Sequence, residues 1–258
     1  MSALLGWWLD CRRSGNNSAS GRRKKRRLNN IEGMKDLNKK AFGGLLRLLI
    51  SLVVLLFLPA WTFDYWQAWI FLAVFSGSVL LITLYLIKED PRLLKRRINA
   101  GPSAEKERSQ KVIQTLALIA FIAVFVFSAV DHRFAWSRVP PYTVAAGDIL
   151  VMLGLLIIFL VFKENTFTSA VIEIATEQRV ISTGPYAFVR HPMYIGAIVM
   201  LLGVPLALGS WWGLLTVIPI TLVIVWRLLD EEQFLTKKLS GYSEYRSKVR
   251  YRLVPFIW

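Results

Sequence analysis

The chain has very few side chains that could form disulfides or bind a metal ion. Its 258 residues include one cysteine and two histidines. Cys11 alone cannot form an intramolecular disulfide or a cysteine metal cluster. His132 and His191 lie far apart in the sequence, which argues against a histidine zinc site. We therefore expect no metal at the functional site.

Glycine-rich cofactor motifs are also missing. The sequence contains neither G-x-G-x-x-G nor G-x-x-x-x-G-K-[ST], the patterns of dinucleotide-binding and phosphate-binding loops. A Rossmann-type cofactor domain is therefore not expected. The N-terminal tail lacks the long apolar segment of a secretory signal peptide.

Acidic residues are scarce relative to basic ones. The 17 Asp and Glu residues face 32 Lys and Arg residues, which gives a net charge of +15. The basic residues gather in the N-terminal tail, in the segment 88–111 and in the C-terminal tail, all beside apolar runs. Positive loops of this kind orient a membrane protein and attract anionic lipid. The charge therefore favours membrane lipids, and no nucleic acid, as partners.

Apolar residues are abundant, at 55% of the chain, against about 45–50% in soluble domains. They form six runs near the length of a membrane-spanning helix, about 20 residues. The runs cover 42–60, 66–87, 112–130, 143–162, 192–208 and 211–229. None alternates with period two as a barrel strand does. The sequence predicts an all-α polytopic membrane protein with about six transmembrane helices.

The distribution of charge predicts the topology and the organisation of the chain. The tail before the first run is basic, whereas the link 61–65 holds Asp64 and no Lys or Arg. This places both termini in the cytoplasm, as in a bacterial inner-membrane protein. We expect a disordered tail over 1–40, with its first 33 residues dispensable, four transmembrane helices over 41–162, and a functional core over 163–258. In the segment 88–111, Leu93, Leu94 and Ile98 among basic residues predict a short amphipathic helix on the inner leaflet.

One motif concentrates polar groups at the start of the last hairpin, 192–229. Gly184-Pro185 predicts a turn, and Pro192 can open a helix at its first position. His191 would then lie at a helix N-terminus, where backbone N–H groups favour an anionic ligand group. The alternative is that Tyr186, His191 and Tyr194 only anchor the helix at the membrane interface.

The other end of the hairpin carries Arg227, Glu231 and Glu232. Arg227 and Glu231 are four residues apart and share a helix face, so an ordinary ion pair is one interpretation. The alternative is a site, since Arg227 ends an apolar span and the closed hairpin brings it near His191. The hairpin itself is expected to turn at Gly209-Ser210.

Together these residues resemble the isoprenylcysteine carboxyl methyltransferase family, which is related to the phospholipid methyltransferases, in a bacterial-type member. The resemblance covers Gln178 to Pro255. It rests on Gly184-x-Tyr186-x-x-x-Arg190-His191-Pro192-x-Tyr194-x-Gly196, Arg227-x-x-x-Glu231-Glu232, Tyr242-x-x-Tyr245 and Pro255. The four N-terminal spans match that family only in being apolar.

The resemblance implies an integral membrane methyltransferase that uses S-adenosyl-L-methionine, with a cytosolic cofactor pocket formed by the 163–194 loop and the C-terminal helix. A lipidic methyl acceptor would enter from the bilayer. It implies cofactor-binding roles for Gln178, Arg179, Val180, Ile181, Tyr186, His191, Pro192, Met193, Tyr194 and Glu231.

The resemblance also implies that Arg227 binds the substrate carboxylate and that Arg227 and Glu231 form the catalytic pair. A carboxylate acceptor is already ionised at pH 7, and arginine suits it through a bidentate pair. An amine would need a base, for which Glu231, Glu232 and His191 are the candidates. A phospholipid amine, a thiol, and a non-enzymatic lipid-binding role therefore stay open as alternatives, and the sequence does not indicate an oligomeric state.

Overall fold

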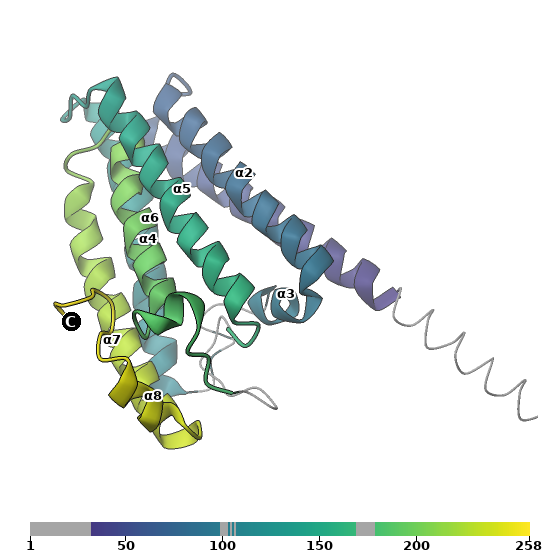
Figure 1. The fold of residues 1–258 in the computed structure, drawn as a ribbon. Helices are drawn as coiled ribbons and strands as arrows, with labels where there is room; N and C mark the ends of the chain where they lie inside the picture. The colour runs from purple at the N-terminus through teal and green to yellow at the C-terminus, as the bar shows by residue number, and fades with distance from the viewer. Residues whose placement is uncertain (1–31, 99–102, 104, 106, 169–178) are drawn as a thin grey trace, which may run out of the picture. The chain divides into compact units, whose positions relative to one another are not determined.

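A computed structural model describes residues 32–98, 103, 105, 107–168 and 179–258 (Figure 1). The chain divides into two units, Met1–Gly43 and Gly44–Trp258. The described residues are helical and include no strand, which confirms the predicted all-α polytopic membrane fold. The elements are the helix Glu32–Ala60, followed by α2 (Trp66–Glu89), α3 (Pro91–Ile98), α4 (Arg108–Phe134), α5 (Pro141–Glu164), the 3-10 turn η2 (Gly184–Ala187), α6 (Pro192–Ala207), α7 (Leu214–Lys238) and α8 (Tyr242–Lys248).

Four of the described helices are long and apolar enough to cross a membrane: Glu32–Ala60, α2, α4 and α5. They correspond to the first four predicted spans. α6 is apolar but has only 16 residues, about 24 Å at 1.5 Å per residue, which is short of a hydrocarbon core of about 30 Å. α7 has 25 residues, but Asp230, Glu231 and Glu232 interrupt its apolar run. The membrane-spanning role of this hairpin stays a prediction.

The first helix begins earlier than the sequence predicted. It starts at Glu32, so residues 32–40 are helical and do not belong to a disordered tail. Residues 32–40 include good helix formers, and an ion pair of 2.8 Å joins Lys40 Nζ to Asp36 one turn earlier. The rest of the expected disordered tail lies outside the described residues.

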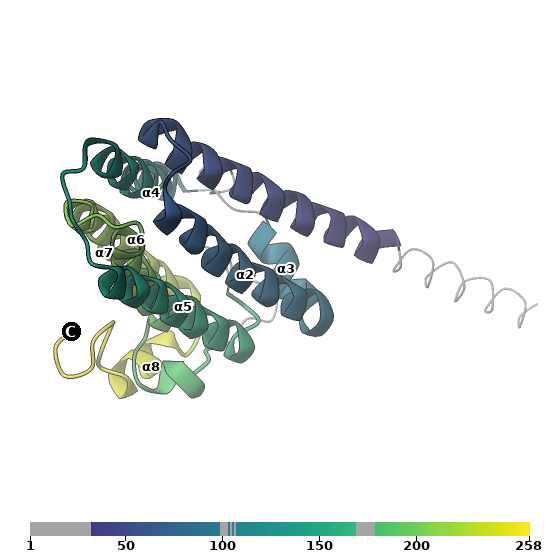
Figure 2. The same ribbon diagram turned by 90° about the horizontal axis from the view of Figure 1, so that it is seen from above.

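Glycines set the packing of α5 against α6, which run side by side (Figures 1 and 2). A Cβ on Gly154 would lie 2.5 Å from the Gly196 carbonyl oxygen, and one on Gly203 would lie 2.6 Å from that of Gly147. The two glycines on each helix are seven residues apart, so they lie on the same face. Small residues let helix backbones approach this closely in a membrane. This contact fixes the start of α6 against the end of α5.

Buried polar groups join the α6–α7 turn to the end of α4. The fully buried Asp131 accepts hydrogen bonds from the Ser137 hydroxyl at 2.6 Å and from the Ser210 hydroxyl. Gly209 in this turn has a φ of 72°, a conformation that favours glycine. The hairpin therefore turns at the predicted place, and α7 returns along α4.

The segment between α2 and α4 forms the predicted amphipathic helix. α3 begins at Pro91, where Asp90 Oδ1 accepts a hydrogen bond of 3.0 Å from the Leu93 amide. Leu93 and Leu94 are buried within the protein. The apolar face therefore packs on the fold, and the basic face brings Arg96 and Arg97 toward the ends of α5 and α6.

Candidate functional site

The predicted motif begins α6. His191 is the residue before the helix, and Pro192 occupies its first turn, as expected. The backbone N–H groups of Arg190 and His191 donate to the Tyr251 and Arg252 carbonyls at 2.9 and 3.0 Å. The start of α6 is therefore held by the C-terminal segment, which lies about 60 residues further along the chain.

Tyr194 and Glu231 form the centre of the site. The Tyr194 hydroxyl donates to Glu231 Oε2 at 2.6 Å, and Tyr194 is buried beside Leu228. One turn before Glu231, the Arg227 guanidinium reaches Glu105 Oε1 at 3.0 Å and donates to Gln110 Oε1 at 3.3 Å. The hairpin thus brings Tyr194, Arg227 and Glu231 together, and the carboxylate bound to Arg227 at 3.0 Å is Glu105.

Glu105 and Gln110 belong to this site although the sequence analysis did not single them out. Glu105 is 3% exposed and Gln110 is 1% exposed. Gln114 donates to Glu105 at 3.1 Å, and Gln110 donates to Asp230. A polar network therefore binds the start of α4 to the charged part of α7. The signal available in the sequence was the pair Gln110 and Gln114, one turn apart at the start of an apolar helix.

Arg97 of α3 is a second site residue that the sequence analysis missed. Its guanidinium lies 4.4 Å from the Phe162 ring centroid and against the Met193 sulfur. Burial lowers the pKa of Arg97 to about 10, an effect that Tyr186, Tyr194 and Glu231 nearby partly offset. Arg97 is still a cation at pH 7, so a second guanidinium faces the Tyr194–Glu231 pair beside Arg227.

His191 faces Glu232 in this structure. Its Nε2 atom lies 3.5 Å from Glu232 Oε1, which is also 3.0 Å from Arg190 Nε. The other Glu232 oxygen accepts from Arg252 Nε at 2.9 Å. Burial alone would raise the pKa of Glu232, but the contacts with His191 and Arg252 and the Arg190 charge lower it to about 2. Glu231 and Glu232 therefore serve two different clusters.

Tyr186 is positioned from two sides. Its hydroxyl accepts a hydrogen bond of 3.1 Å from Asn165 at the end of α5. Its carbonyl accepts one of 2.8 Å from the Tyr245 hydroxyl. Burial raises the pKa of Tyr186 to about 12, so the phenol is neutral at physiological pH. The Gly184 backbone, with a φ of 57°, packs on Glu164.

The remaining residues predicted to bind the cofactor lie along the same edge. Val180 packs with Tyr186, Tyr242 and Tyr245, whereas Arg179 is exposed and Ile181 is half-buried. Pro192 is buried and Met193 half-buried. Gln178 lies outside the described residues.

The part of this arrangement that lies on α5, α6 and α7 falls within a stretch that is similar to a known enzyme family. Residues 142–241 match the family described as phospholipid methyltransferase. The match begins in α5, so the similarity reaches beyond the C-terminal region to which the sequence analysis confined it. α5 also takes part in the site, since it packs on α6 through glycine and the residue after it, Asn165, binds Tyr186.

One curated relative is a reductase. The chain is 32% identical over 87 residues to Delta(14)-sterol reductase of Mus musculus. This alignment covers 33% of the chain and 21% of the reductase, so the chain spans about a fifth of the length of that relative. Together with the fold, the comparisons define a polytopic helical membrane protein with a methyltransferase-like region.

Proposed function

We propose that this chain is an integral membrane S-adenosyl-L-methionine-dependent methyltransferase that methylates the carboxylate of an isoprenylcysteine-like or other lipidic acceptor. The observation that carries the proposal is the convergence of Tyr194, Glu231 and Arg227 at one end of the hairpin α6–α7. This convergence lies inside the stretch that matches the phospholipid methyltransferase family.

The chemistry of the side chains suits the cofactor. Glu231 offers a carboxylate that can accept hydrogen bonds from ribose or amino groups, and the rings of Tyr186 and Tyr194 offer apolar surface. The Tyr242 hydroxyl is buried and has no hydrogen-bond partner among the described residues, which leaves a polar atom for a ligand to satisfy. When bound, the cofactor supplies a methyl group on a sulfonium. Val180, Ile181, His191, Pro192 and Met193 would form the adjoining wall, with Arg179 beside it, and the resemblance assigns Gln178 to the same cofactor.

The charges around Arg227 favour a carboxylate acceptor. A Glu105 carboxylate oxygen lies 3.0 Å from the Arg227 guanidinium. An acceptor carboxylate would make the same contact. An acceptor that displaces Glu105 exchanges one charge-assisted pair for another at the guanidinium, while Glu105 keeps the hydrogen bond of 3.1 Å that Gln114 donates. Arg97, a second cation close to the same pair, adds to the attraction.

An in-line methyl transfer asks the protein mainly to position the reactants and to exclude water. Arg227 would orient the attacking oxygen, while Glu231, fixed by Tyr194, would position the cofactor. A carboxylate needs no base at neutral pH because it is already ionised. The site would therefore work without a proton transfer.

A lipid reductase is the second candidate, because of the similarity to the sterol reductase. Reduction of a double bond needs a hydride donor, for which the same pocket would bind a nicotinamide cofactor. Phospholipid amine or thiol methylation, and lipid binding without catalysis, are the further alternatives.

Isothermal titration of the purified chain with S-adenosylhomocysteine, and in parallel with NADPH, tests the proposal. We expect heat with the first ligand only, and a Glu231→Gln variant should weaken it about tenfold or more by removing a hydrogen bond to a charged group. Glu244→Gln, an exposed carboxylate on α8, is the matched control and should bind as the native chain does. Heat with NADPH alone would favour the reductase, and no heat with either would favour lipid binding without catalysis.

A methyl-transfer screen then identifies the acceptor class. Lipids that carry a carboxylate, an amine or a thiol are offered with labelled cofactor. The proposal expects label in a base-labile ester of the carboxylate lipid, and label in the amine or thiol lipid alone would contradict the carboxylate assignment.

A further inference from the structure

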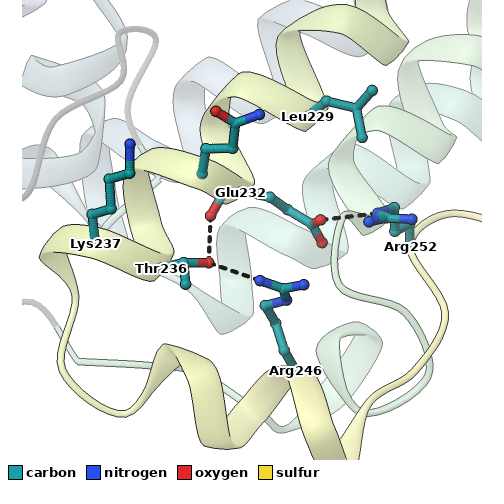
Figure 3. A pocket seen from close by; sticks show the side chains of 7 residues that line it. Leu229, Glu232, Thr236, Lys237, Arg246 and Arg252 are labelled. Atoms are coloured by element: carbon teal, nitrogen blue, oxygen red, sulfur yellow. Dashed lines mark hydrogen bonds and ion pairs between the residues drawn. The ribbon is translucent and has the colours of Figure 1, made fainter.

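A cavity lies on the face of α7 opposite Arg227 and Glu231. Its volume is about 250 Å³, well above the ~30 Å³ that one water molecule occupies in the liquid. It is lined by Leu229, Glu232, Gln233, Thr236, Lys237, Arg246 and Arg252 (Figure 3). The α7 members recur every three or four residues, which places them on one helix face, and Arg227 and Glu231 lie on the other.

Cations outnumber anions around this cavity. Lys237, Arg246 and Arg252 line it, and Glu232 is the one carboxylate among the lining residues. Glu232 is already shared between Arg252 Nε at 2.9 Å and the adjacent Arg190 Nε at 3.0 Å. The Arg246 guanidinium donates to the neutral Thr236 hydroxyl at 3.1 Å (Figure 3). The positive charges repel one another, and an anion placed between them would relieve this repulsion.

The polar groups suit a tetrahedral oxyanion. Arginine offers a planar fork of N–H donors and lysine a compact charge, and both bind phosphate. Gln233 adds a neutral amide donor on the same face of α7, whereas the Thr236 hydroxyl already donates to the Glu232 carbonyl at 2.6 Å. No described carboxylate is paired with Arg246 or Lys237 at 4.0 Å or less, so their charges are available to an anion.

The cavity lies at the depth of lipid headgroups in the predicted topology. The apolar part of α7 ends at Leu229. At 1.5 Å per residue, the lining positions from Glu232 to Lys237 are about 5–12 Å beyond that point. The polar layer of each leaflet is about 5–8 Å thick, from the difference between the hydrocarbon core and the whole bilayer. The anion that reaches this depth in a membrane is a lipid phosphate.

We propose that this basic cavity binds the phosphate group of an anionic phospholipid of the cytoplasmic leaflet, at a site separate from the Arg227–Glu231 centre. Lys237, Arg246 and Arg252 neutralise the phosphate, and the Gln233 amide donates to its oxygens. The bound lipid does not react, because the methyl-transfer centre lies on the opposite face of α7. It joins α8 and the C-terminal segment to α7.

Two double variants with the same change of net charge test the proposal. Lys237→Gln with Arg246→Gln removes two cations from the cavity. Lys238→Gln with Arg250→Gln removes two exposed cations from neighbouring positions that do not line it. The full chain, purified in a neutral detergent, is titrated with phosphatidylglycerol, phosphatidylcholine and inorganic phosphate, with binding followed by native mass spectrometry and by the midpoint of thermal unfolding.

The native chain should bind phosphatidylglycerol in preference to phosphatidylcholine. The cavity pair, Lys237→Gln with Arg246→Gln, should weaken this binding about tenfold or more for each charge-assisted hydrogen bond that it removes. The control pair, Lys238→Gln with Arg250→Gln, should leave it nearly unchanged. Inorganic phosphate that displaces the lipid would support a phosphate site that also accepts a soluble source. The affinity for S-adenosylhomocysteine should be the same in all three proteins.

If both double variants lose the same affinity for phosphatidylglycerol, the proposal is overturned. Surface charge in general would then account for lipid binding. A weaker affinity for S-adenosylhomocysteine in the cavity pair would also overturn it, because the cavity would then belong to the cofactor site. If the cavity pair does not fold, Lys237→Gln alone, at an exposed position, is compared with Lys238→Gln under the same two criteria.

Discussion

Arg227 is the residue on which the proposed choice of acceptor depends. Its guanidinium lies between Glu105, just before α4, and the Tyr194–Glu231 pair. A planar fork binds a carboxylate through two parallel hydrogen bonds, which an ammonium cannot reproduce. Side-chain identity at this position should therefore affect turnover more than cofactor affinity.

We predict that Arg227→Lys lowers turnover of a carboxylate acceptor about tenfold or more, as expected when a charge-assisted hydrogen bond is removed. Arg227→Ala should be worse, because it leaves Glu105 or the acceptor carboxylate buried without a partner. Turnover and S-adenosylhomocysteine affinity are measured on both variants, with the exposed Arg250→Lys as the control. Retained turnover in Arg227→Ala would falsify the carboxylate assignment, and a parallel decrease in affinity would mean that Arg227 only orients Glu231.

Glu232 gives the site a dependence on pH. Its folded-state pKa is about 2, against about 4.3 for an unperturbed glutamate. A depressed pKa means that the ion pairs contribute their full stability above the unfolded value, and that this contribution is lost as the pH falls through about 2.

We predict that Glu232→Gln destabilises the chain most near neutral pH, by about 3 kcal/mol. The difference in unfolding free energy between this variant and the native chain should become smaller between about pH 5 and pH 2, because native Glu232 becomes protonated there. Thermal unfolding in detergent at a series of pH values measures this difference in stability. Glu244→Gln, at an exposed position on α8, is the control. A stability difference that does not change with pH would contradict the assignment of this stability to the ion pairs of Glu232.

At the scale of elements, the glycines between α5 and α6 decide where the motif lies. Gly154 and Gly196 approach so closely that an added methyl group would meet backbone atoms. Backbone cannot move aside as a flexible side chain can, so the helices would have to separate. Separation would move Tyr194 away from Glu231 and the end of α5 away from Tyr186.

We predict that Gly154→Ala lowers stability by about 1–3 kcal/mol, the usual cost of overpacking, and weakens cofactor binding in parallel. Gly77→Ala in α2 is the matched control, since a Cβ there meets nothing within 4 Å. It should be neutral or more stable by up to about 1 kcal/mol, because alanine is the better helix former. Thermal unfolding of the two variants measures the difference, and equal midpoints would mean that α5 and α6 are not in tight contact.

At the scale of the whole molecule, the predicted topology would place the site at the cytoplasmic surface. The prediction rests on basic loops at one side of the apolar helices. It requires the link after α4 and the C-terminal α8 to lie on opposite sides of the membrane.

We predict that cysteines placed at Arg138 and at Ser243 label from opposite sides. Both positions are exposed to solvent, and the lone native cysteine is first replaced by Cys11→Ser. An impermeant thiol reagent applied to intact spheroplasts should modify Arg138→Cys alone, and both variants should react after lysis. Modification of both in intact spheroplasts would mean that the even number of spans is wrong.

The sequence by itself determined the elements that depend on local chemistry. Pro192 opens α6, Gly209 lies in the turn of the hairpin, and Pro91 begins the amphipathic α3. The apolar runs located the long helices, because run length and hydropathy are properties of a single segment. The start of the first helix was the exception, since the polar residues before the apolar run are also helical, from Glu32.

Only the tertiary structure decided which charged groups meet. Glu231 and Glu232 are neighbours in sequence, but successive residues of a helix point about 100° apart. One therefore reaches Tyr194, and the other reaches His191, Arg190 and Arg252. Arg97 and Glu105 arrive from segments far back along the chain, through helix packing that no local pattern records. The cavity beside Arg246 arises in the same way, from the return of α8 and the C-terminal segment onto α7.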